Sequence, residues 1–159
     1  MKTYKFSIVF AVLLVIANFF HFRVEKWLLA LGTRNSVLYL IYGLFLAFFL
    51  VAFLKKFPRI DNQEIGILLL TMGFVFFLLF TRTVFLFQLS VLEMFALGVI
   101  VSLEGKKSKS LLPFLIVLIT AALVEVSSSL STGSHFYYLD AWRNGLVALS
   151  GYLAGFLLI

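Results

Sequence analysis

The sequence predicts an all-α fold, a polytopic membrane bundle of about six transmembrane helices, with five as the alternative count. Hydrophobic residues make up 63% of the 159 residues and charged residues only 13%, whereas soluble domains have about half and about a quarter. Six apolar stretches approach the roughly 20 residues that a helix needs to cross a bilayer. We therefore expect one integral membrane domain over residues 1–159. With so few charges, the net charge of +6 indicates topology rather than nucleic-acid binding.

The expected spans follow from the apolar stretches and the residues that interrupt them. They are 6–22, 36–54, 63–81, 83–103, 111–128 and 139–159. The first follows Lys2 and Lys5, as in a signal peptide, but no small-residue cleavage site comes after it, so we expect a retained span. Residues 24–32 are amphipathic and should lie in the membrane interface with Trp27 as an anchor. The connection around Arg82 leaves room only for a tight hairpin between the third and fourth spans.

Basic residues divide unevenly between the two sides on which the connections of a six-span chain alternate. The side that holds the termini has eight: Lys2, Lys5, Lys55, Lys56, Arg59, Lys106, Lys107 and Lys109. The other side has five: Arg23, Lys26, Arg34, Arg82 and Arg143. The positive-inside rule then places both termini in the cytoplasm and the serine-rich stretch 127–134 on the outer side.

Glu93 is the first candidate for a functional residue, because it lies near the middle of the fourth span. An ionisable group inside a membrane is costly, so Glu93 should face the bundle interior and be either protonated or paired. One interpretation is a neutral acid that bonds to a neighbouring helix. The other is a functional group, such as a proton site.

Further polar residues gather in the outer part of the fifth and sixth spans. Glu125 shares a helix face with Ser128, although it could also be a helix-end carboxylate that reaches interfacial water. Asp140 and Asn144 are i,i+4 neighbours on one helix face. Asp140 could simply be an acid in the first helical turn, where the helix dipole favours a negative charge, but this would not explain Asn144. Arg143 is the natural partner for one of the carboxylates. We expect these residues and Glu93 to meet in one water-accessible hollow below the outer surface, with a structural hydrogen-bond cluster as the alternative.

Small residues below Asn144 predict a close helix contact. Gly151 and Gly155 form a Gly-x-x-x-Gly pair on the same face of the sixth span, which lets another helix approach closely. Gly98 in the fourth span is a third candidate packing position.

No motif in the sequence assigns a reaction, a metal or a cofactor. The chain has no cysteine, no nucleotide-binding or zinc-protease motif, and no Gly-x-Ser-x-Gly elbow. His21 and His135 could join Glu125 and Asp140 in a metal or acid–base site, but four helices separate them, which gives no ligand spacing. A Ser–His–Asp hydrolase built on His135 and Asp140 is formally open. We expect no metal and no cofactor, and a classical enzyme is not the favoured interpretation.

Two blocks of the sequence carry a family resemblance. Residues 90–98 read Ser-Val-Leu-Glu-Met-Phe-Ala-Leu-Gly. Residues 125–155 contain two acids, an amide and a glycine at defined spacings: Glu125, Asp140, Asn144 and Gly151. Together they resemble the VanZ-like family of small bacterial membrane proteins. Its first motif, His-x-x-Glu-Tyr-x-x-x-Gly, is matched at Glu93 and Gly98, whereas Ser90 replaces the histidine and Met94 the tyrosine.

The second block matches the family at four positions: Glu125, Asp140, Asn144 and Gly151. It departs from the family at three, where Val124 replaces an aspartate, Ser128 a glutamine and Ser134 the arginine of a Pro-x-Arg turn. The two blocks cover about a quarter of the chain, so the resemblance implies a divergent member of the family.

The resemblance implies a cell-envelope role rather than a reaction, because the member that gives the family its name is associated with resistance to teicoplanin-type glycopeptides without a settled biochemical activity. Our first hypothesis is therefore a protein of the bacterial plasma membrane that binds or acts on an outer-leaflet lipid or lipid-linked envelope component. The second is a proton-coupled small transporter or flippase with Glu93 as its proton site. The third is a non-catalytic subunit that packs through Gly151 and Gly155 against a membrane-protein partner or in a homo-oligomer.

Overall fold

The computed structural model describes residues 4–56, 61–81, 85–105 and 111–158. Within these ranges all regular secondary structure is helical, with six α-helices and no strand. Their bounds are α1 Lys5–Ala30, α2 Arg34–Lys56, α3 Asn62–Thr81, α4 Phe85–Gly105, α5 Leu112–Thr132 and α6 Tyr138–Leu158. The predicted all-α fold is confirmed. Several sequence positions discussed above lie outside the described residues: Lys2, Arg59, Arg82, Lys106, Lys107, Lys109 and Ile159.

Five of these helices, α1 to α5, are long and apolar enough to cross a membrane. The chain is therefore a multi-pass membrane protein by the length and composition of its helices. Helix α6 has 21 residues, enough for a span, but it is less apolar. Asp140, Arg143 and Asn144 lie in its first two turns and lower its hydropathy.

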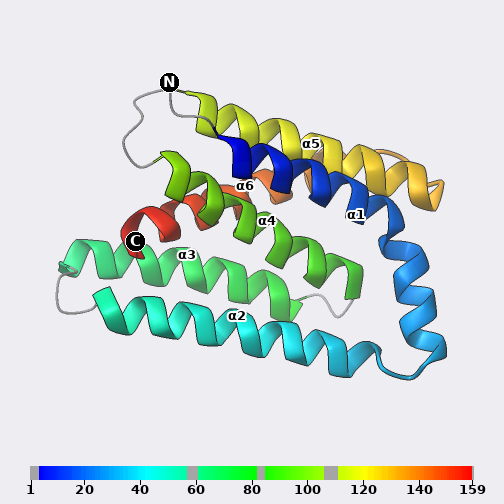
Figure 1. The fold of residues 1–159 in the computed structure, drawn as a ribbon, viewed down its shortest axis with the longest axis horizontal. Coiled ribbons are helices and arrows are strands. Elements are labelled where there is room, and N and C mark those ends of the chain that lie inside the picture. Colours follow the sequence, from blue (N-terminus) through cyan, green and yellow to red (C-terminus); the bar gives the residue numbers. More distant parts are fainter. Residues whose placement is uncertain (1–3, 57–60, 82–84, 106–110, 159) are drawn as a thin grey trace.

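The first helix extends further than predicted. Helix α1 continues through residues 24–30, which we expected as a separate interfacial segment, because no proline or glycine occurs before Gly32. Gly32 adopts a left-handed φ of +67°, and the N–H of Thr33 bonds to the carbonyl of Leu28 at 3.1 Å, which is a glycine-based helix end. Figure 1 shows that α1 bends and that its last turns lead away toward α2.

Helices α4 and α6 form the centre of the bundle and share its most extensive contact. Helices α1 and α5 pack together on one side, and α3 contacts α6 on the other, with α2 outermost (Figure 1). The fully buried side chains come mainly from this centre, for example Met94, Phe95 and Val147. The start of α1 and the end of α6 lie at one end of the bundle, and the connection between α5 and α6 lies at the other (Figure 1).

The contact between α4 and α6 depends on glycines. A Cβ atom at Gly98 would lie 1.9 Å from the carbonyl oxygen of Ala148, and one at Gly151 would lie 2.1 Å from that of Phe95. A Cβ at Gly155 would lie 3.0 Å from Cα of Val99. Backbone therefore touches backbone along this seam, which is the close approach that Gly-x-x-x-Gly permits. All three predicted packing glycines contact the neighbouring central helix of the same chain, so this face is not free for a partner protein.

Glu104, near the end of α4, fixes where α1 begins. Its carboxylate oxygens accept the backbone N–H of Phe6 at 3.0 Å and of Ser7 at 2.8 Å, together with the hydroxyl of Ser7. A helix start has unpaired N–H groups and a partial positive charge, and a carboxylate satisfies both. This contact ties the first turn of α1 to the last turn of α4.

Substituting Gly151 with alanine should destabilise the protein by about 1–3 kcal/mol, because the new methyl group overlaps backbone atoms that cannot rotate away. The measurement is the thermal unfolding midpoint of the purified protein in detergent micelles. Gly43→Ala is the matched control, since nothing lies within 4 Å of the added Cβ and alanine favours a helix interior. An equal or higher midpoint for Gly151→Ala than for Gly43→Ala would contradict the backbone contact.

Candidate functional site

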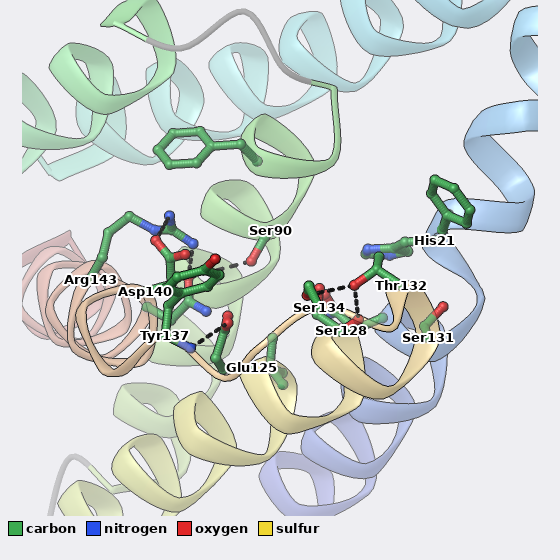
Figure 2. Close-up of a pocket in the computed structure, with 15 residues that line it drawn as sticks. His21, Ser90, Glu125, Ser128, Ser131, Thr132, Ser134, Tyr137, Asp140 and Arg143 are labelled. Atoms are coloured by element: carbon green, nitrogen blue, oxygen red, sulfur yellow. Dashed lines mark hydrogen bonds and ion pairs between the residues drawn. The ribbon is translucent and has the colours of Figure 1, made fainter.

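A polar pocket of about 260 Å³ lies at the end of the bundle that carries the α5–α6 connection (Figure 2). Its walls come from α1, α4, α5, α6 and that connection. The lining residues are Asn18, His21, Phe22, Phe87, Ser90, Val124, Glu125, Ser128, Ser131, Thr132, Ser134, Tyr137, Asp140, Arg143 and Asn144. In Figure 2 the charged groups of α5 and α6 lie on one side and His21 with several hydroxyls on the other. Carboxylates, amides, hydroxyls, an imidazole and a guanidinium thus surround one space.

The structure brings together most of the residues that the sequence singled out. Glu125, Ser128, Asp140, Arg143 and Asn144 all line the pocket. Glu93 is the exception, because it is absent from the lining and lies behind two residues that do line it. The expected convergence of three spans on one hollow therefore holds for α5 and α6 directly, and for Glu93 of α4 only through its partners.

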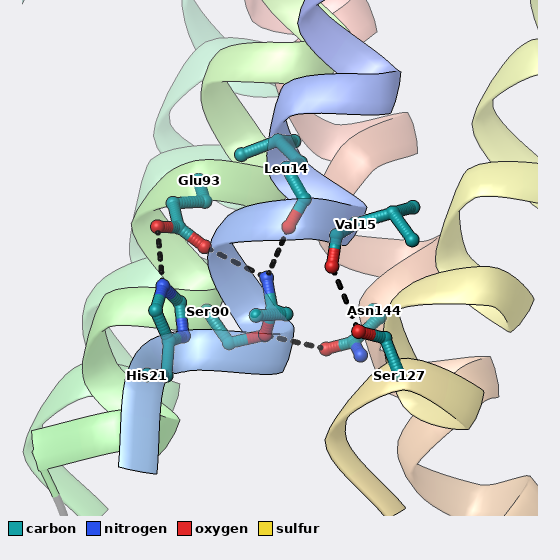
Figure 3. Close-up of polar contacts among 8 residues, drawn as sticks. Leu14, Val15, His21, Ser90, Glu93, Ser127 and Asn144 are labelled. Atoms are coloured by element: carbon teal, nitrogen blue, oxygen red, sulfur yellow. Dashed lines mark hydrogen bonds and ion pairs between the residues drawn. The ribbon is translucent and has the colours of Figure 1, made fainter. Parts of the chain in front are cut away.

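The partners of Glu93 come from α1. One carboxylate oxygen lies 3.0 Å from Nε2 of His21, and the other accepts Nδ2 of Asn18 at 3.1 Å (Figure 3). The Asn18 amide also donates to the carbonyl of Leu14 at 3.0 Å. Only 18% of the Glu93 side chain and 10% of the His21 side chain are exposed. A buried carboxylate needs such partners, so this network explains how α4 accommodates Glu93.

Sequence reasoning considered His21 together with Glu125 and Asp140, which all line the pocket, but it missed Asn18 and the contact of both α1 residues with Glu93. Asn18 and His21 are three residues apart and therefore share one face of α1, and they are the two polar residues of its otherwise apolar stretch 8–22. That spacing was the available signal, but it does not say which helix the face meets. His135, the other histidine considered, is exposed and outside the pocket, and its carbonyl accepts the Ser129 hydroxyl at 3.4 Å.

Helix α6 contributes a connected set of polar side chains. Arg143 donates to a carboxylate oxygen of Asp140 at 2.6 Å and to the side-chain oxygen of Asn144 at 3.0 Å. Its guanidinium also stacks 4.3 Å from the ring centre of Phe87 on α4. The Ser90 hydroxyl donates to the same Asn144 oxygen at 3.4 Å. Asp140 and Arg143 therefore neutralise each other, and Asn144 links their pair to α4.

Glu125 of α5 is less well satisfied than the other acids. Its carboxylate accepts the backbone N–H of Tyr137 at a long 3.5 Å, and only 8% of the residue is exposed. Among the described residues it forms no ion pair within 4.0 Å. Glu125 is thus a buried acid that faces the pocket, attracted by the Arg143 guanidinium but not in an ion pair with it among the described residues.

The acids and histidines of the described residues do not gather into a group of three or more suited to a metal ion. The arrangement offers other chemistry. Hydroxyls, amides and carboxylates suit hydrogen bonding to a polar ligand, and the His21–Glu93 pair can hold a proton.

Comparison with known proteins finds no protein-family model, no curated protein and no solved structure that matches this chain. The VanZ-like resemblance therefore rests on its two sequence blocks. Of these, Glu125, Asp140 and Asn144 line the pocket, Glu93 lies directly behind it, and the glycines lie in the α4–α6 contact.

Removing either member of the Glu93–His21 pair should destabilise the protein by about 1–3 kcal/mol, because each substitution leaves a buried polar group without its partner. We expect Glu93→Leu and His21→Leu to cost less together than the sum of their separate effects. Chemical unfolding of the four proteins of this double-mutant cycle in detergent measures the coupling. Strict additivity would show that the two side chains do not interact.

Proposed function

We propose that the chain is a VanZ-like protein of the bacterial plasma membrane that binds the head group of an outer-leaflet lipid or lipid-linked envelope component. The observation that supports this most is the polar pocket itself, in which Glu125, Asp140, Arg143 and Asn144 meet His21 within a membrane domain. Polar groups inside membrane domains are costly and commonly mark a ligand site or pathway. The pocket has the donors and acceptors that a head group requires.

The residues around the mouth of the pocket support a position at the membrane surface. The lining residues Ser134 and Tyr137 are exposed, so the pocket reaches the outside of the bundle. Next to them Tyr138 is 66% exposed and Trp142 63%. Tyrosine and tryptophan favour the membrane–water interface. A lipid could therefore place its head group in the pocket while its acyl chains stay in the bilayer.

The proposal takes α6 as a sixth span and places both chain ends in the cytoplasm. The start of α1, the end of α2 and the end of α6 lie at the same end of the bundle, opposite the α5–α6 connection (Figure 1). Lys5 begins α1, and Lys55 and Lys56 end α2. The positive-inside rule assigns that basic end to the cytoplasm and the pocket to the outer leaflet. By the family resemblance, the bound component would belong to the cell wall or envelope, and the protein would contribute to glycopeptide tolerance.

A proton-coupled transporter is the second candidate, and one observation favours it. In the buried Glu93–His21 pair, His21 lines the pocket and Glu93 lies directly behind it, so that the pair can exchange a proton with a ligand there. The third hypothesis, a subunit that packs through Gly151 and Gly155, loses its expected surface, because α4 of the same chain occupies it.

Alanine at Glu125 or Asp140 should lower the affinity for the bound lipid by about tenfold or more, because each removes a hydrogen-bonding charge from the pocket. Native mass spectrometry of protein purified with membrane lipids measures retention, and glycopeptide tolerance of the producing strain gives a second readout. Asp61→Ala is the control, since Asp61 is exposed at the start of α3 and outside the pocket. Full lipid retention and full tolerance in both stable pocket variants would refute the proposal.

The proposed orientation predicts opposite labelling of two exposed positions. The chain has no cysteine, so Ser134→Cys and Asn62→Cys each carry a single thiol. A membrane-impermeant maleimide should label position 134 in intact cells and position 62 only after lysis, because the two lie at opposite ends of the bundle. The reverse pattern would place the pocket on the cytoplasmic side.

A further inference from the structure

We propose that the pocket selects a head group that carries a primary ammonium, with Glu125 as its counter-ion. This inference rests on the proposed function and names the chemical class that the site would take. Two features of the pocket carry it. The inner polar network fixes which amide atoms face the ligand, and among the described residues the buried carboxylate of Glu125 has no ion pair.

The orientation of Asn144 is fixed by its neighbours. Its side-chain oxygen accepts from the guanidinium of Arg143 at 3.0 Å and from the hydroxyl of Ser90 at 3.4 Å. A guanidinium can only donate, so the oxygen of Asn144 must face it and the NH₂ group must face away. Only 1% of Asn144 is exposed, and within the described chain its NH₂ group donates to no protein atom. The α6 wall of the pocket therefore offers a buried donor.

The amide of Asn18 is fixed in the opposite sense. The Asn18 NH₂ group donates to the carbonyl of Leu14 and to Glu93, so its oxygen is left for the pocket. Nε2 of His21 lies 3.0 Å from a carboxylate oxygen of Glu93, so Nδ1 is the ring nitrogen that is not in contact with Glu93 (Figure 3). The α1 wall therefore offers the Asn18 oxygen as an acceptor to a ligand that carries N–H or O–H groups.

The charges of the pocket favour a cation. Its lining holds two carboxylates and one guanidinium, and the guanidinium of Arg143 is paired with Asp140 at 2.6 Å. Glu125 remains, 8% exposed and without an ion pair among the described residues. A buried carboxylate is costly until a partner compensates its charge. A phosphate placed beside Glu125 would add repulsion instead.

The acceptor on the α1 wall calls for a ligand with N–H donors, and Glu125 calls for a positive charge. A primary ammonium meets both conditions, because it carries three N–H donors and one positive charge. A quaternary ammonium has the charge without the donors, and a glycerol head group has the donors without the charge. Phosphatidylethanolamine carries both the charge and the donors, phosphatidylcholine only the charge, and phosphatidylglycerol only the donors. Comparing the three lipids therefore separates the two conditions. The remaining donors, the Asn144 amide and the serine hydroxyls, are available to the ester or phosphate oxygens of the same lipid.

The test is a binding titration of the purified full-length protein in detergent with these three lipids, read by native mass spectrometry. We expect phosphatidylethanolamine to bind about tenfold more tightly than either of the others. Glu125→Gln should remove this preference, because the amide keeps the shape and loses the charge. Glu64→Gln is the matched control, since Glu64 lies at the start of α3 outside the pocket, and it should keep the wild-type preference.

The outcomes separate the two proposals. Tighter binding of phosphatidylglycerol or phosphatidylcholine by the wild-type protein, or an unchanged preference in Glu125→Gln, would overturn the ammonium inference while leaving head-group binding intact. Absence of specific binding by all three lipids would overturn the proposed function as well. Soluble glycerophosphoethanolamine distinguishes a free solute from a membrane lipid as the source of the ammonium. If it binds as tightly as phosphatidylethanolamine, the inference holds with a free solute as the ligand. If it binds more weakly, the inference holds with a membrane lipid.

Discussion

The polar end of the molecule depends on how closely α6 approaches α4. At Gly98 and Gly151 the backbone of one helix touches the backbone of the other, with no side chain between them to absorb a shift. Such a contact fixes both the distance between the helices and their relative height. Two turns along α6 from Gly151, this height places Asn144 beside Ser90 of α4. The apolar seam thereby sets the position of the polar side chains, and an error in it would displace every group that α6 contributes to the pocket.

Glu93 has a comparable effect on α1. It lies in an apolar helix where an unpaired carboxylate would be costly, and it is satisfied by Asn18 and His21. Because the carboxylate accepts the Asn18 amide and contacts Nε2 of His21, it also sets which atoms of these two side chains remain for the pocket. Arg143 does the same for Asn144 on the opposite wall. The hydrogen-bonding character of the pocket is therefore set by residues that face away from it, and the ligand has to match a pattern that the protein has already fixed.

Much of the fold could be predicted from the sequence, because helix length and hydropathy are local properties. The all-helical membrane class and most helix bounds follow from them, and the polar residues of α5 and α6 were found because i,i+4 spacing places them on one face. Which helices become neighbours is a long-range property. No spacing rule joins His21 to Glu93, 72 residues away, so the contact between them was missed, although His21 itself was a candidate. The extension of α1 beyond residue 24 was also missed, since an amphipathic segment can either continue a helix or lie apart from it.

The most direct test of the account is an experimental structure of the protein in a bilayer of bacterial lipids, determined by electron microscopy with a bound antibody fragment. The account predicts density for a lipid head group between Glu125, Asn144 and His21, with its acyl chains outside the bundle. An empty or closed space there, with the polar side chains of α1, α5 and α6 directed at separate neighbours or toward acyl chains, would contradict the central claim that these helices build one ligand pocket.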